Sequence, residues 1–380
     1  MKVLFLIGSV GDYHTARLSD AARRLAEFNV EFSALVMNHK SADYLHRDPQ
    51  RDALNPAGTN WRYMTKDGKR RRQPMILARL FAEVVREKPD LIVTIGYNFS
   101  YSVVGLIYRW MTGRTRIVFC ADSKFDDGTR CPSREMVKAW IASLYDGAIV
   151  AGRRQRVYFE FLGIPAQHIL VGYDVVDNDR FMTSAAAARM QGAEFRRRMG
   201  LPEKYIICVS RLIARKRVDK AIDAYARSRA RENGVSLLVI GTGELESSLR
   251  ERCVRFGLAD NVVFKGLVPN HEMPIFLALA SFMVLLSDYD QWGLCLNEAL
   301  ACGTPVLCSD SCGAAHELVR HGENGFVTDG TDADIDRGME LLLDDEKLSA
   351  IKHNFPWNLG DWDLRRFSDN VLNFANRFSK

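Results

Sequence analysis

The sequence lacks the features of a membrane-spanning, disulfide-linked or disordered protein. No apolar stretch approaches the ~18 residues that a bilayer-spanning helix needs. The eight cysteines show no disulfide-framework spacing, which predicts reduced thiols in the cytosol. No low-complexity tract interrupts the chain, and the 47% hydrophobic and 26% charged residues are typical of a globular protein. Residues 1–10 lack a small-residue cleavage pattern, so we interpret them as a buried strand and not as a signal peptide.

Motifs for zinc and for dinucleotides are also missing. Cys308 and Cys312 are followed by His316 and His321, but zinc sites usually pair their cysteines as Cys-x2-Cys, and no second pair follows. This spacing favours a turn between a strand and a helix over a metal site. The loop of residues 8–14 lacks G-x-G-x-x-G, which argues against a Rossmann oxidoreductase.

The positive charge is concentrated in the first half of the chain. Residues 1–180 hold 27 Lys/Arg against 20 Asp/Glu, whereas the remaining 200 residues hold 25 against 27. The first half contains a basic run at residues 69–72 and a second group in which Trp110 accompanies Arg109, Arg114 and Arg116. Such a face suits a phosphate or an anionic membrane, but we favour a plain solvated surface, and both interpretations stay open.

Strand and helix signals alternate along the first half. Apolar runs predict strands at residues 3–8, 30–37, 91–96, 117–120, 147–151 and 169–172, with helices over 15–28, 75–88, 100–112, 133–144 and 153–162. Residues 47–73 show no regular pattern. This alternation predicts parallel β–α–β units in a doubly wound sheet. Because ligands of such sheets bind beyond the carboxyl ends of the strands, we expect a pocket from loops 8–14, 96–99 and 121–127.

A second alternation begins after residues 181–200, which predict a connecting helix. It predicts strands at 205–210, 236–241, 262–264 and 282–286, and helices over 217–230, 244–256, 271–279 and from 294. An amphipathic terminal segment predicts a last helix. We therefore expect an α/β protein with two Rossmann-like domains, residues 1–182 and 183–356, facing each other across a cleft. A C-terminal helix, residues 357–380, should cross the junction and pack back towards the first domain.

The stretch of residues 287–325 holds the side chains best suited to chemistry. Asp290 and Glu298 lie eight positions apart around Gly293 and the start of a predicted helix. The two carboxylates could form a general acid–base pair. Alternatively, Glu298 could begin a helix, where a negative charge is favourable.

Basic residues and a glycine turn precede this stretch. Arg211 and Lys216 follow the predicted strand 205–210, where cations can face a cleft or simply lie on the surface. Gly241-Thr242-Gly243 follows another predicted strand and opens a helix. Its amides suit a diphosphate, although glycine turns of this kind are common.

Four segments follow one another at characteristic spacing over residues 204–330: VSRLIARKRVDKAIDAYA, LLVIGTGELESSLR, VVFKGLVP and SDYDQWGLCLNEALACGTPVLCSDSCGAAHELVRHGENGFV. Together they resemble the retaining GT-B glycosyltransferases of family 4, and the first half of the chain resembles that family more weakly. The resemblance places the family's Glu-x7-Glu motif on Asp290 and Glu298. It implies that Glu298 holds the ribose hydroxyls of a nucleotide, that Asp290 contacts the donor sugar, and that Arg211 and Lys216 neutralise the donor diphosphate.

The resemblance implies a full set of site residues and partners. The expected catalytic residues are Arg211, Lys216, Asp290 and Glu298, and substrate binding adds Gly11, Asp122, Gly243, Val268, Gly293 and Leu294. A UDP- or GDP-sugar is expected as the donor substrate, with no cofactor and no metal. The expected acceptor is a saccharide or a polyprenyl-diphosphate-linked saccharide, held by the basic first domain. Nucleic acid is not an expected partner.

The sequence departs from the family at three places. Asp290 stands where the family usually has Glu, and is one methylene shorter. Ala121-Asp122 stands where the family often has a His-Asp pair, which leaves Asp122 as a candidate for the sugar or acceptor. His14 is a candidate substitute for the absent histidine, although we expect an exposed loop histidine there. Arg217 replaces the usual glycine after Lys216, which adds charge and removes flexibility.

The resemblance implies a metal-independent, retaining glycosyltransferase of surface polysaccharide or glycolipid synthesis. We expect a cytoplasmic protein, with peripheral contact at the inner membrane face as an open alternative. A catalytically impaired sugar-nucleotide-binding protein and a Rossmann oxidoreductase are the other candidates.

Overall fold

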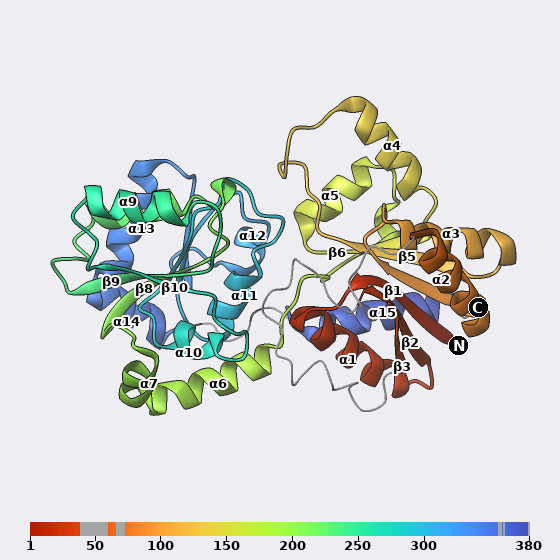
Figure 1. Cartoon of the computed structure of the whole chain (residues 1–380), viewed down its shortest axis with the longest axis horizontal. Coiled ribbons are helices and arrows are strands. Elements are labelled where there is room, and N and C mark those ends of the chain that lie inside the picture. Colours follow the sequence, from red (N-terminus) through yellow and green to blue (C-terminus); the bar gives the residue numbers. More distant parts are fainter. Residues whose placement is uncertain (39–59, 66–72, 356–358, 360–361, 379–380) are drawn as a thin grey trace. The chain divides into compact units, whose positions relative to one another are not determined.

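The computed structural model describes residues 1–38, 60–65, 73–355, 359 and 362–378. The chain divides into two compact units, one of Met1–Val176 with Asp361–Lys380 and one of Asp177–Gly360 (Figure 1). We call them the first and the second unit and describe each by itself. The sequence-based boundary at 182/183 falls inside the helix that opens the second unit.

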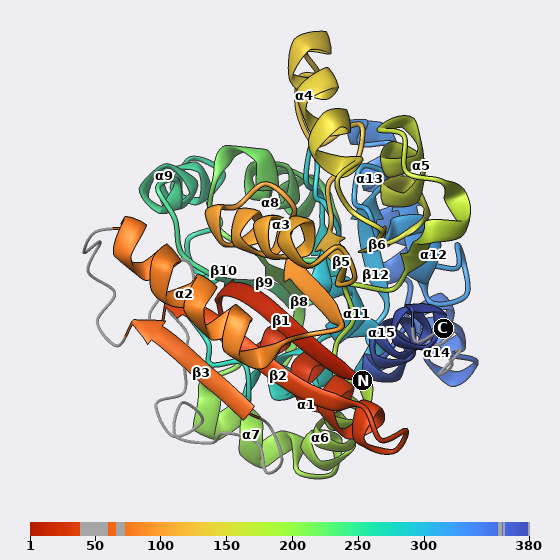
Figure 2. The same ribbon diagram turned by 90° about the vertical axis from the view of Figure 1, so that its right-hand side faces the viewer.

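The first unit is built on a parallel sheet in the order β3-β2-β1-β4-β5-β6-β7. Its strands are β1 (Lys2–Ser9), β2 (Glu31–Asn38), β3 (Asn60–Thr65), β4 (Leu91–Ile95), β5 (Arg116–Ala121), β6 (Gly147–Val150) and β7 (Ile169–Val171). Its helices are α1 (Asp12–Ala26), α2 (Gln73–Glu87), α3 (Ser100–Thr112), α4 (Pro132–Ala142), α5 (Arg153–Phe161), the short η1 (Ala166–His168) and α15 (Leu364–Phe378). Figure 2 shows α1 and α15 on one face of the sheet and α2 and α3 on the other.

The buried centre of this sheet follows from its sequence. All five residues from Val3 to Ile7 in β1 are at most 1% exposed. A near-continuous apolar run of this kind is typical of a parallel strand that helices cover on both faces. The structure therefore confirms the α/β fold class that the alternation predicts.

The second unit repeats the architecture with the parallel order β10-β9-β8-β11-β12-β13. Its strands are β8 (Lys204–Val209), β9 (Val235–Ile240), β10 (Val262–Gly266), β11 (Met283–Leu285), β12 (Val306–Ser309) and β13 (Gly325–Thr328). Its helices are α6 (Asn178–Met190), α7 (Gly192–Met199), η2 (Ala214–Lys216), α8 (Val218–Arg227), α9 (Glu246–Arg255), α10 (Met273–Ala278), α11 (Leu294–Ala301), α12 (Ala315–Leu318), α13 (Asp332–Leu343) and α14 (Asp345–His353).

Several local predictions need correction. Helix α1 begins at Asp12, three positions before the expected start at residue 15, because Gly11 is extended (φ −109°) and Asp12 favours the first turn. The region of residues 47–73, which shows no regular pattern, contains strand β3 at the sheet edge. The connecting helix expected over 181–200 is two helices, α6 and α7, that meet at Gln191.

The last helix of the chain belongs to the first unit. Within α15, Ser368 Oγ donates a hydrogen bond to Asp20 Oδ2 of α1 at 2.6 Å, and Arg24 Nε of α1 donates to Asp369 Oδ1 at 2.7 Å. The ring centroid of Phe367 lies 6.3 Å from that of Phe5 in the central strand. Helix α15, which follows the second unit in the chain, therefore packs as part of the first unit. Across the described ranges, no helix has both the length and the apolar character needed to cross a bilayer.

Candidate active site in the second unit

The strand order places two loops at the centre of the second unit. The order reverses between β8 and β11, since β9 and β10 lie on one side of this pair and β12 and β13 on the other. In open α/β sheets, ligands bind beyond the carboxyl ends of the strands at such a reversal. The two loops that follow β8 and β11 carry Arg211, Lys216 and Asp290. Three of the expected site residues therefore lie where the topology predicts a ligand.

Lys216 and Asp290 form a direct ion pair across these loops. The Lys216 ammonium hydrogen-bonds to Asp290 Oδ2, although the two residues are 74 positions apart in the chain. Arg215 Nη1 lies 4.0 Å from Asp290 Oδ1 and donates to the Tyr289 carbonyl at 3.1 Å. Asp290 is only 7% exposed. Two cations thus surround one buried carboxylate, so this corner of the site remains attractive to a further negative charge.

Arg217 fixes the two loops to each other. Its Nη1 donates to Asp288 Oδ1 at 2.9 Å, and its Nε donates to Asp219 Oδ1 at 3.1 Å. The Asp288 amide in turn donates to the Arg215 carbonyl at 2.8 Å. Arg217 has a φ of +46°, in the left-handed region that favours glycine. The family's usual glycine therefore has a structural reason here, and the two ion pairs of Arg217 offset the strain of replacing it.

Arg211 presents a cation without a neutralising partner. It is exposed just after β8, and among the described residues no side chain forms an ion pair or a hydrogen bond with its guanidinium. Its neighbour Leu212 is held by Thr242, since the Leu212 amide donates to the Thr242 carbonyl at 2.9 Å. The loop of Arg211 is thereby anchored on the glycine turn that follows β9.

The glycines of that turn are required by close backbone packing. A Cβ on Gly241 would lie 1.9 Å from the Ser210 carbonyl oxygen, and one on Gly243 would lie 2.3 Å from that of Leu212. Helix α9 begins only at Glu246. The main role of these two glycines is therefore to let the backbone of the Arg211 loop pack closely against the turn. This role does not depend on whether their amides also bind a ligand.

Glu298 lies in the second turn of α11, which follows Gly293 at a φ of +94°. The alternative that Glu298 merely begins a helix is therefore wrong. Its side chain is buried at 2% exposure and accepts a hydrogen bond from Asn270 Nδ2 at 3.3 Å. Arg180 Nη2 holds the amide of Asn270 by donating to its Oδ1 at 2.6 Å. A carboxylate fixed in this way is suited to accept hydrogen bonds from neighbouring hydroxyls.

The Cys295 thiol shows that these groups are gathered at one place. Its pKa is raised well above the usual range, first by burial. Lys216 lowers that pKa, while Asp290 and Glu298 raise it, so all three lie within electrostatic reach of Cys295. The structure therefore brings Lys216, Asp290 and Glu298 together around the first turns of α11.

Val268 and Leu294 complete the expected residues of this unit, and both are at least partly buried. Val268 is 7% exposed, and Leu294, the first residue of α11, is half-buried. The sequence reasoning missed Arg215, Asn270 and Arg180. Arg215 adjoins Lys216, and Asn270 follows the quoted VVFKGLVP segment. Their positions next to the motifs are therefore a signal that could have identified both residues.

Cys308 and Cys312 belong to the packing of this region. Both are buried, and Cys312 Sγ lies 3.6 Å from Ser309 Oγ and 4.0 Å from the Leu285 carbonyl oxygen. The amide of Gly313 donates to the Asp290 carbonyl at 3.0 Å. The turn after β12 therefore contacts the Asp290 loop through a backbone hydrogen bond. In the part of the chain that the structure describes, no group of three or more His, Cys, Asp and Glu side chains could hold a metal ion.

Gly11 and Asp122 lie in the first unit, after β1 and β5 at the carboxyl edge of its sheet. Burial, and then the nearby charge of Asp174, raises the pKa of Asp122 to about 7. Asp174 is itself paired with the buried Arg17 at 3.1 Å. Asp122 is thus a carboxyl group that can carry or release a proton near neutral pH.

His14 differs from the expectation of an exposed loop histidine. It lies in the first turn of α1, is half-buried, and hydrogen-bonds through Nε2 to the Tyr173 hydroxyl at 3.3 Å. Burial, followed by the charge of Arg17, lowers its pKa to about 3. His14 is therefore neutral at physiological pH, at the same sheet edge as Gly11.

Two arginines of the second basic group of the first unit share one carboxylate, that of Asp146. Arg109 donates to both carboxylate oxygens of Asp146, at 3.0 and 2.9 Å, and Arg116 lies 3.0 Å from Oδ1 of the same residue. Trp110 between them is 84% exposed. The basic run at residues 69–72 lies outside the described residues.

A known protein family matches the region that contains this site. The family Glycosyl transferases group 1 matches residues 193–354, which include the ion pair, the glycine turn and α11. Residues 193–354 are a glycosyl transferases group 1 domain. The family resemblance noted in the sequence is thereby confirmed.

Two relatives of the chain illustrate the range of similar proteins. A GDP-mannose-dependent alpha-(1-6)-phosphatidylinositol monomannoside mannosyltransferase of Mycobacterium tuberculosis is 36% identical over 186 residues, 46% of this chain and 47% of the relative. A 2-deoxystreptamine glucosyltransferase of Streptomyces kanamyceticus is 26% identical over 247 residues, 64% of this chain and 63% of the relative. The match thus spans about half the length of the mannosyltransferase and somewhat more of the glucosyltransferase.

Solved structures extend the likeness in fold to the whole chain. Anabaena HepE in complex with UDP and glucose has a TM-score of 0.76 at 20% identity, covering 99% of this chain and 100% of that one. WaaG, a glycosyltransferase of lipopolysaccharide biosynthesis, has a TM-score of 0.69 at 14% identity, covering 98% and 99%. The group 1 domain is therefore the second half of a GT-B fold, as the sequence predicts.

Proposed function

We propose that this protein is a metal-independent, retaining glycosyltransferase that moves a hexose from a nucleoside-diphosphate sugar to a saccharide or lipid-linked saccharide. The observation that carries the proposal is the gathering of Lys216, Arg215 and the buried Glu298 at the strand reversal of a group 1 domain. A cationic corner beside a fixed carboxylate matches a diphosphate next to a ribose. The likeness to solved glycosyltransferases over the whole chain supports the same reading.

In the proposed reaction, the bond between the anomeric carbon and the β-phosphate oxygen breaks. A bond from the same carbon to the acceptor hydroxyl oxygen forms on the same face, and the acceptor proton goes to the departing phosphate oxygen. Negative charge accumulates on the diphosphate, and the preorganised cations of Arg211 and Lys216 stabilise it. Asp290 both faces the donor and orients the Lys216 ammonium through their ion pair.

The donor and acceptor follow as narrower proposals. Relatives at 36% identity depend on GDP-mannose by name, so we propose GDP-mannose as the first donor to test. The acceptor would be held by the first unit, where Gly11 and Asp122 share the carboxyl edge of the sheet. We propose a cytoplasmic setting, in which nucleotide sugars are available.

Thermal shift against GDP, UDP and ADP tests the donor site directly. We expect one diphosphate to raise the Tm clearly above the other two, and donor hydrolysis with the matching sugar to follow, without loss on addition of EDTA. Equal, negligible shifts with all three nucleotides would contradict the proposal.

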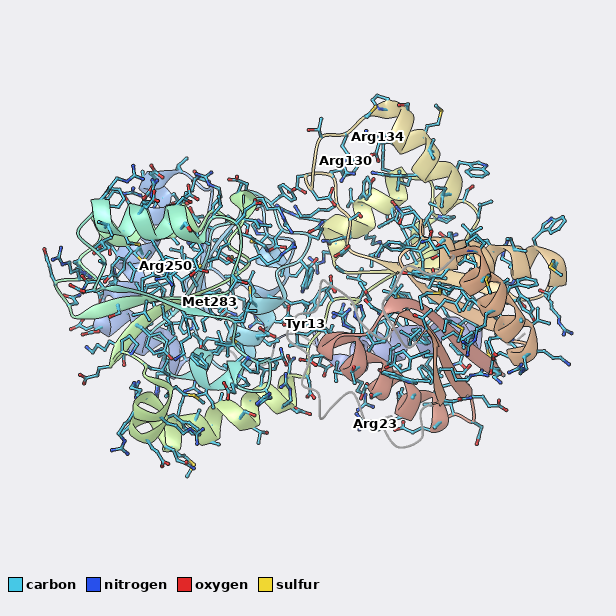
Figure 3. All side chains as sticks on the ribbon, viewed as in Figure 1. Tyr13, Arg23, Arg130, Arg134, Arg250 and Met283 are labelled. Atoms are coloured by element: carbon cyan, nitrogen blue, oxygen red, sulfur yellow. The ribbon has the colours of Figure 1, made fainter. Side chains whose placement is uncertain are left out.

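Removing either cation should lower kcat strongly and change the stability of the fold little. We expect Lys216→Ala and Arg211→Ala each to lower kcat about 100- to 1000-fold, because each removes charge stabilisation from the leaving diphosphate. Arg250→Ala is the matched control, since Arg250 is an exposed arginine on α9 of the same unit (Figure 3). Near-normal activity in both site variants would refute their assignment.

A non-catalytic sugar-nucleotide-binding protein is the one rival that the geometry favours, because Asp290 already occupies the Lys216 ammonium. Donor binding in the absence of both transfer and slow donor hydrolysis would support that rival. In that case Lys216→Ala would weaken nucleotide binding and leave no turnover to lose.

A further inference from the structure

A chain of three polar side chains runs from the start of α6 to the candidate nucleotide ligand Glu298. Arg180 lies in the first turn of α6, Asn270 lies in the loop between β10 and α10, and Glu298 lies in α11. Helix α6 packs against both α10 and α11 (Figure 1), so side chains from separate elements meet there. The reaction proposed above uses Glu298 and assigns no role to the other two residues.

Arg180 holds Asn270 at two places. Its Nη2 donates to Asn270 Oδ1 at 2.6 Å, and its Nη1 donates to the backbone carbonyl of the same residue at 3.5 Å. The Arg180 amide donates to the carboxylate of Asp177, the N-cap residue of α6, at 3.1 Å. The Arg180 guanidinium lies 4.5 Å from the ring centroid of the fully buried Phe181. Arg180 is therefore anchored at both its backbone and its guanidinium, so it can hold Asn270 in place.

The chemistry of arginine sets the direction of the Asn270 amide. A guanidinium only donates hydrogen bonds, so the carbonyl oxygen Oδ1 faces Arg180 and the amide nitrogen Nδ2 faces away from it. Nδ2 donates to Glu298 Oε1 at 3.3 Å. At an asparagine without such a neighbour, the oxygen and the nitrogen could exchange places and present an acceptor to Glu298. Arg180 thus ensures that the Glu298 carboxylate meets a donor, which holds it in one orientation.

The positive charge of Arg180 supports the same arrangement. Glu298 is 2% exposed, and burying a carboxylate is costly unless hydrogen bonds or nearby cations offset the loss of water. Burial, followed by the charge of Glu298, raises the pKa of the Cys302 thiol at the end of α11. Arg189 and Arg180 lower the same pKa. Arg180 and Glu298 therefore lie within electrostatic reach of one thiol, and the cation offsets part of the cost of burying the carboxylate.

We propose that Arg180 and Asn270 are positioning residues that set the preference of the donor site for ribonucleotides over nucleotides without ribose hydroxyls. They orient the Glu298 carboxylate to accept hydrogen bonds from the ribose hydroxyls while Arg211 and Lys216 hold the diphosphate. This inference rests on the proposed function, because it takes Glu298 as the ribose ligand. A hydroxyl that donates to a correctly oriented carboxylate strengthens binding, and a carboxylate turned away from the ribose loses that contribution.

Titration of the whole protein with GDP and with 2′,3′-dideoxy-GDP, which lacks both hydroxyls, tests this inference. The Kd of dideoxy-GDP divided by that of GDP measures the contribution of the hydroxyls. If UDP or ADP gives the larger thermal shift, that nucleotide and its own dideoxy form replace these probes. We expect a ratio of about 30 or more for the wild type, because one hydrogen bond to a charged group changes affinity about tenfold or more.

Removing either supporting side chain should lower this ratio. Asn270→Leu keeps the size of the side chain and removes the donor that faces Glu298. Arg180→Met keeps an apolar stem and removes the cation that orients the amide. We expect each variant to have a ratio below about 5, through weaker binding of GDP. The Kd of dideoxy-GDP should change less than about twofold, because neither variant alters the diphosphate contacts. Arg180→Lys, which can still donate to Asn270 Oδ1, should restore part of the ratio.

Arg189→Met is the matched control. Arg189 is a second arginine of α6, and its guanidinium hydrogen-bonds to the Cys302 carbonyl instead of to Asn270. We expect Arg189→Met to lower the Tm and to keep the wild-type ratio, because it removes a support of the fold and leaves the Asn270 amide in place. The comparison with Arg180→Met therefore separates a general loss of stability from a loss of ribose recognition.

The same titrations contain the results that would overturn the inference. The Arg180 and Asn270 variants could keep the wild-type ratio, or they could weaken GDP and dideoxy-GDP equally, which would leave both residues a structural role only. Equal affinity of the wild type for GDP and dideoxy-GDP would remove Glu298 as the ribose ligand and leave the diphosphate site in place. Failure of the wild type to bind GDP, UDP and ADP would instead contradict the proposed function itself, and the inference would fall with it.

Discussion

Among single residues, Arg217 is one of three described non-glycine residues with a positive φ. Its φ of +46° costs a residue with a Cβ about 1 kcal/mol relative to glycine, and its ion pairs with Asp219 and Asp288 act against this cost. We therefore expect the free energy of unfolding of Arg217→Gly, measured by urea denaturation, to exceed that of Arg217→Ala by about 1 kcal/mol. Both variants lose the ion pairs, but only glycine also relieves the backbone strain. Equal stabilities would show that this backbone is unstrained.

Asp122 should make the first unit less stable as the pH rises. Burial, and then Asp174, raises its folded-state pKa from 3.8 to about 7. Between these values the folded state binds more protons than the unfolded state, so the free energy of unfolding falls as the pH rises. Asp122→Asn removes this loss. Its Tm should therefore exceed that of the wild type at pH 8, and the two values should converge near pH 4.

Asp146 provides a control for the Asp122 prediction, because its pKa is shifted in the opposite direction. Burial alone would raise its pKa, but hydrogen bonds from Arg109 and the Ile117 amide lower it overall. Its contribution to stability is therefore present above pH 3.8 and lost as the pH falls further. Asp146→Asn should lower the Tm at pH 8, and a gain there would contradict the lowered pKa of Asp146.

At the scale of elements, the site depends on two loops that touch backbone to backbone. Gly243→Ala would place a Cβ 2.3 Å from the Leu212 carbonyl oxygen, so one of the loops must shift. We expect this variant to lower the unfolding free energy of the second unit by about 1–3 kcal/mol and to weaken the nucleotide-induced thermal shift.

Gly128→Ala is the control for this prediction, because a Cβ there meets nothing within 4 Å, and neither glycine has a positive φ. Urea unfolding of the two variants separates steric strain from the general effect of adding a methyl group. If Gly243→Ala bound nucleotide as tightly as Gly128→Ala, the anchoring of the Arg211 loop by the glycine turn would be unimportant.

For the whole molecule, the first unit needs both ends of the chain. Phe367 in α15 is fully buried against a unit that otherwise ends at Val176. Phe367→Ala should therefore cost the first unit about 3–5 kcal/mol and leave the nucleotide-induced shift of the second unit in place. Calorimetry can follow both effects, with Phe28→Ala, 49% exposed on the same unit, as the control. Loss of the nucleotide response would mean that the units do not unfold independently.

The sequence by itself determined the alternating elements, the α/β class and the order of the group 1 segments. These properties are local: strand and helix periods show within ten to fifteen residues, and each quoted segment is contiguous. The predictions failed where contacts with another part of the chain determine whether an element forms or where it begins. Strand β3 is an edge strand paired only with β2, and the start of α1 depends on one extended glycine.

Only the tertiary structure decided how the candidate residues are used. Lys216 and Asp290 are 74 positions apart, and Ser368 and Asp20 are 348 apart, yet each pair is in hydrogen-bond contact. A local pattern shows which side chains are available but not which distant partner neutralises or buries them. The same reason explains why the contact of Asn270 with Glu298 and the positive φ of Arg217 became visible only in the folded chain.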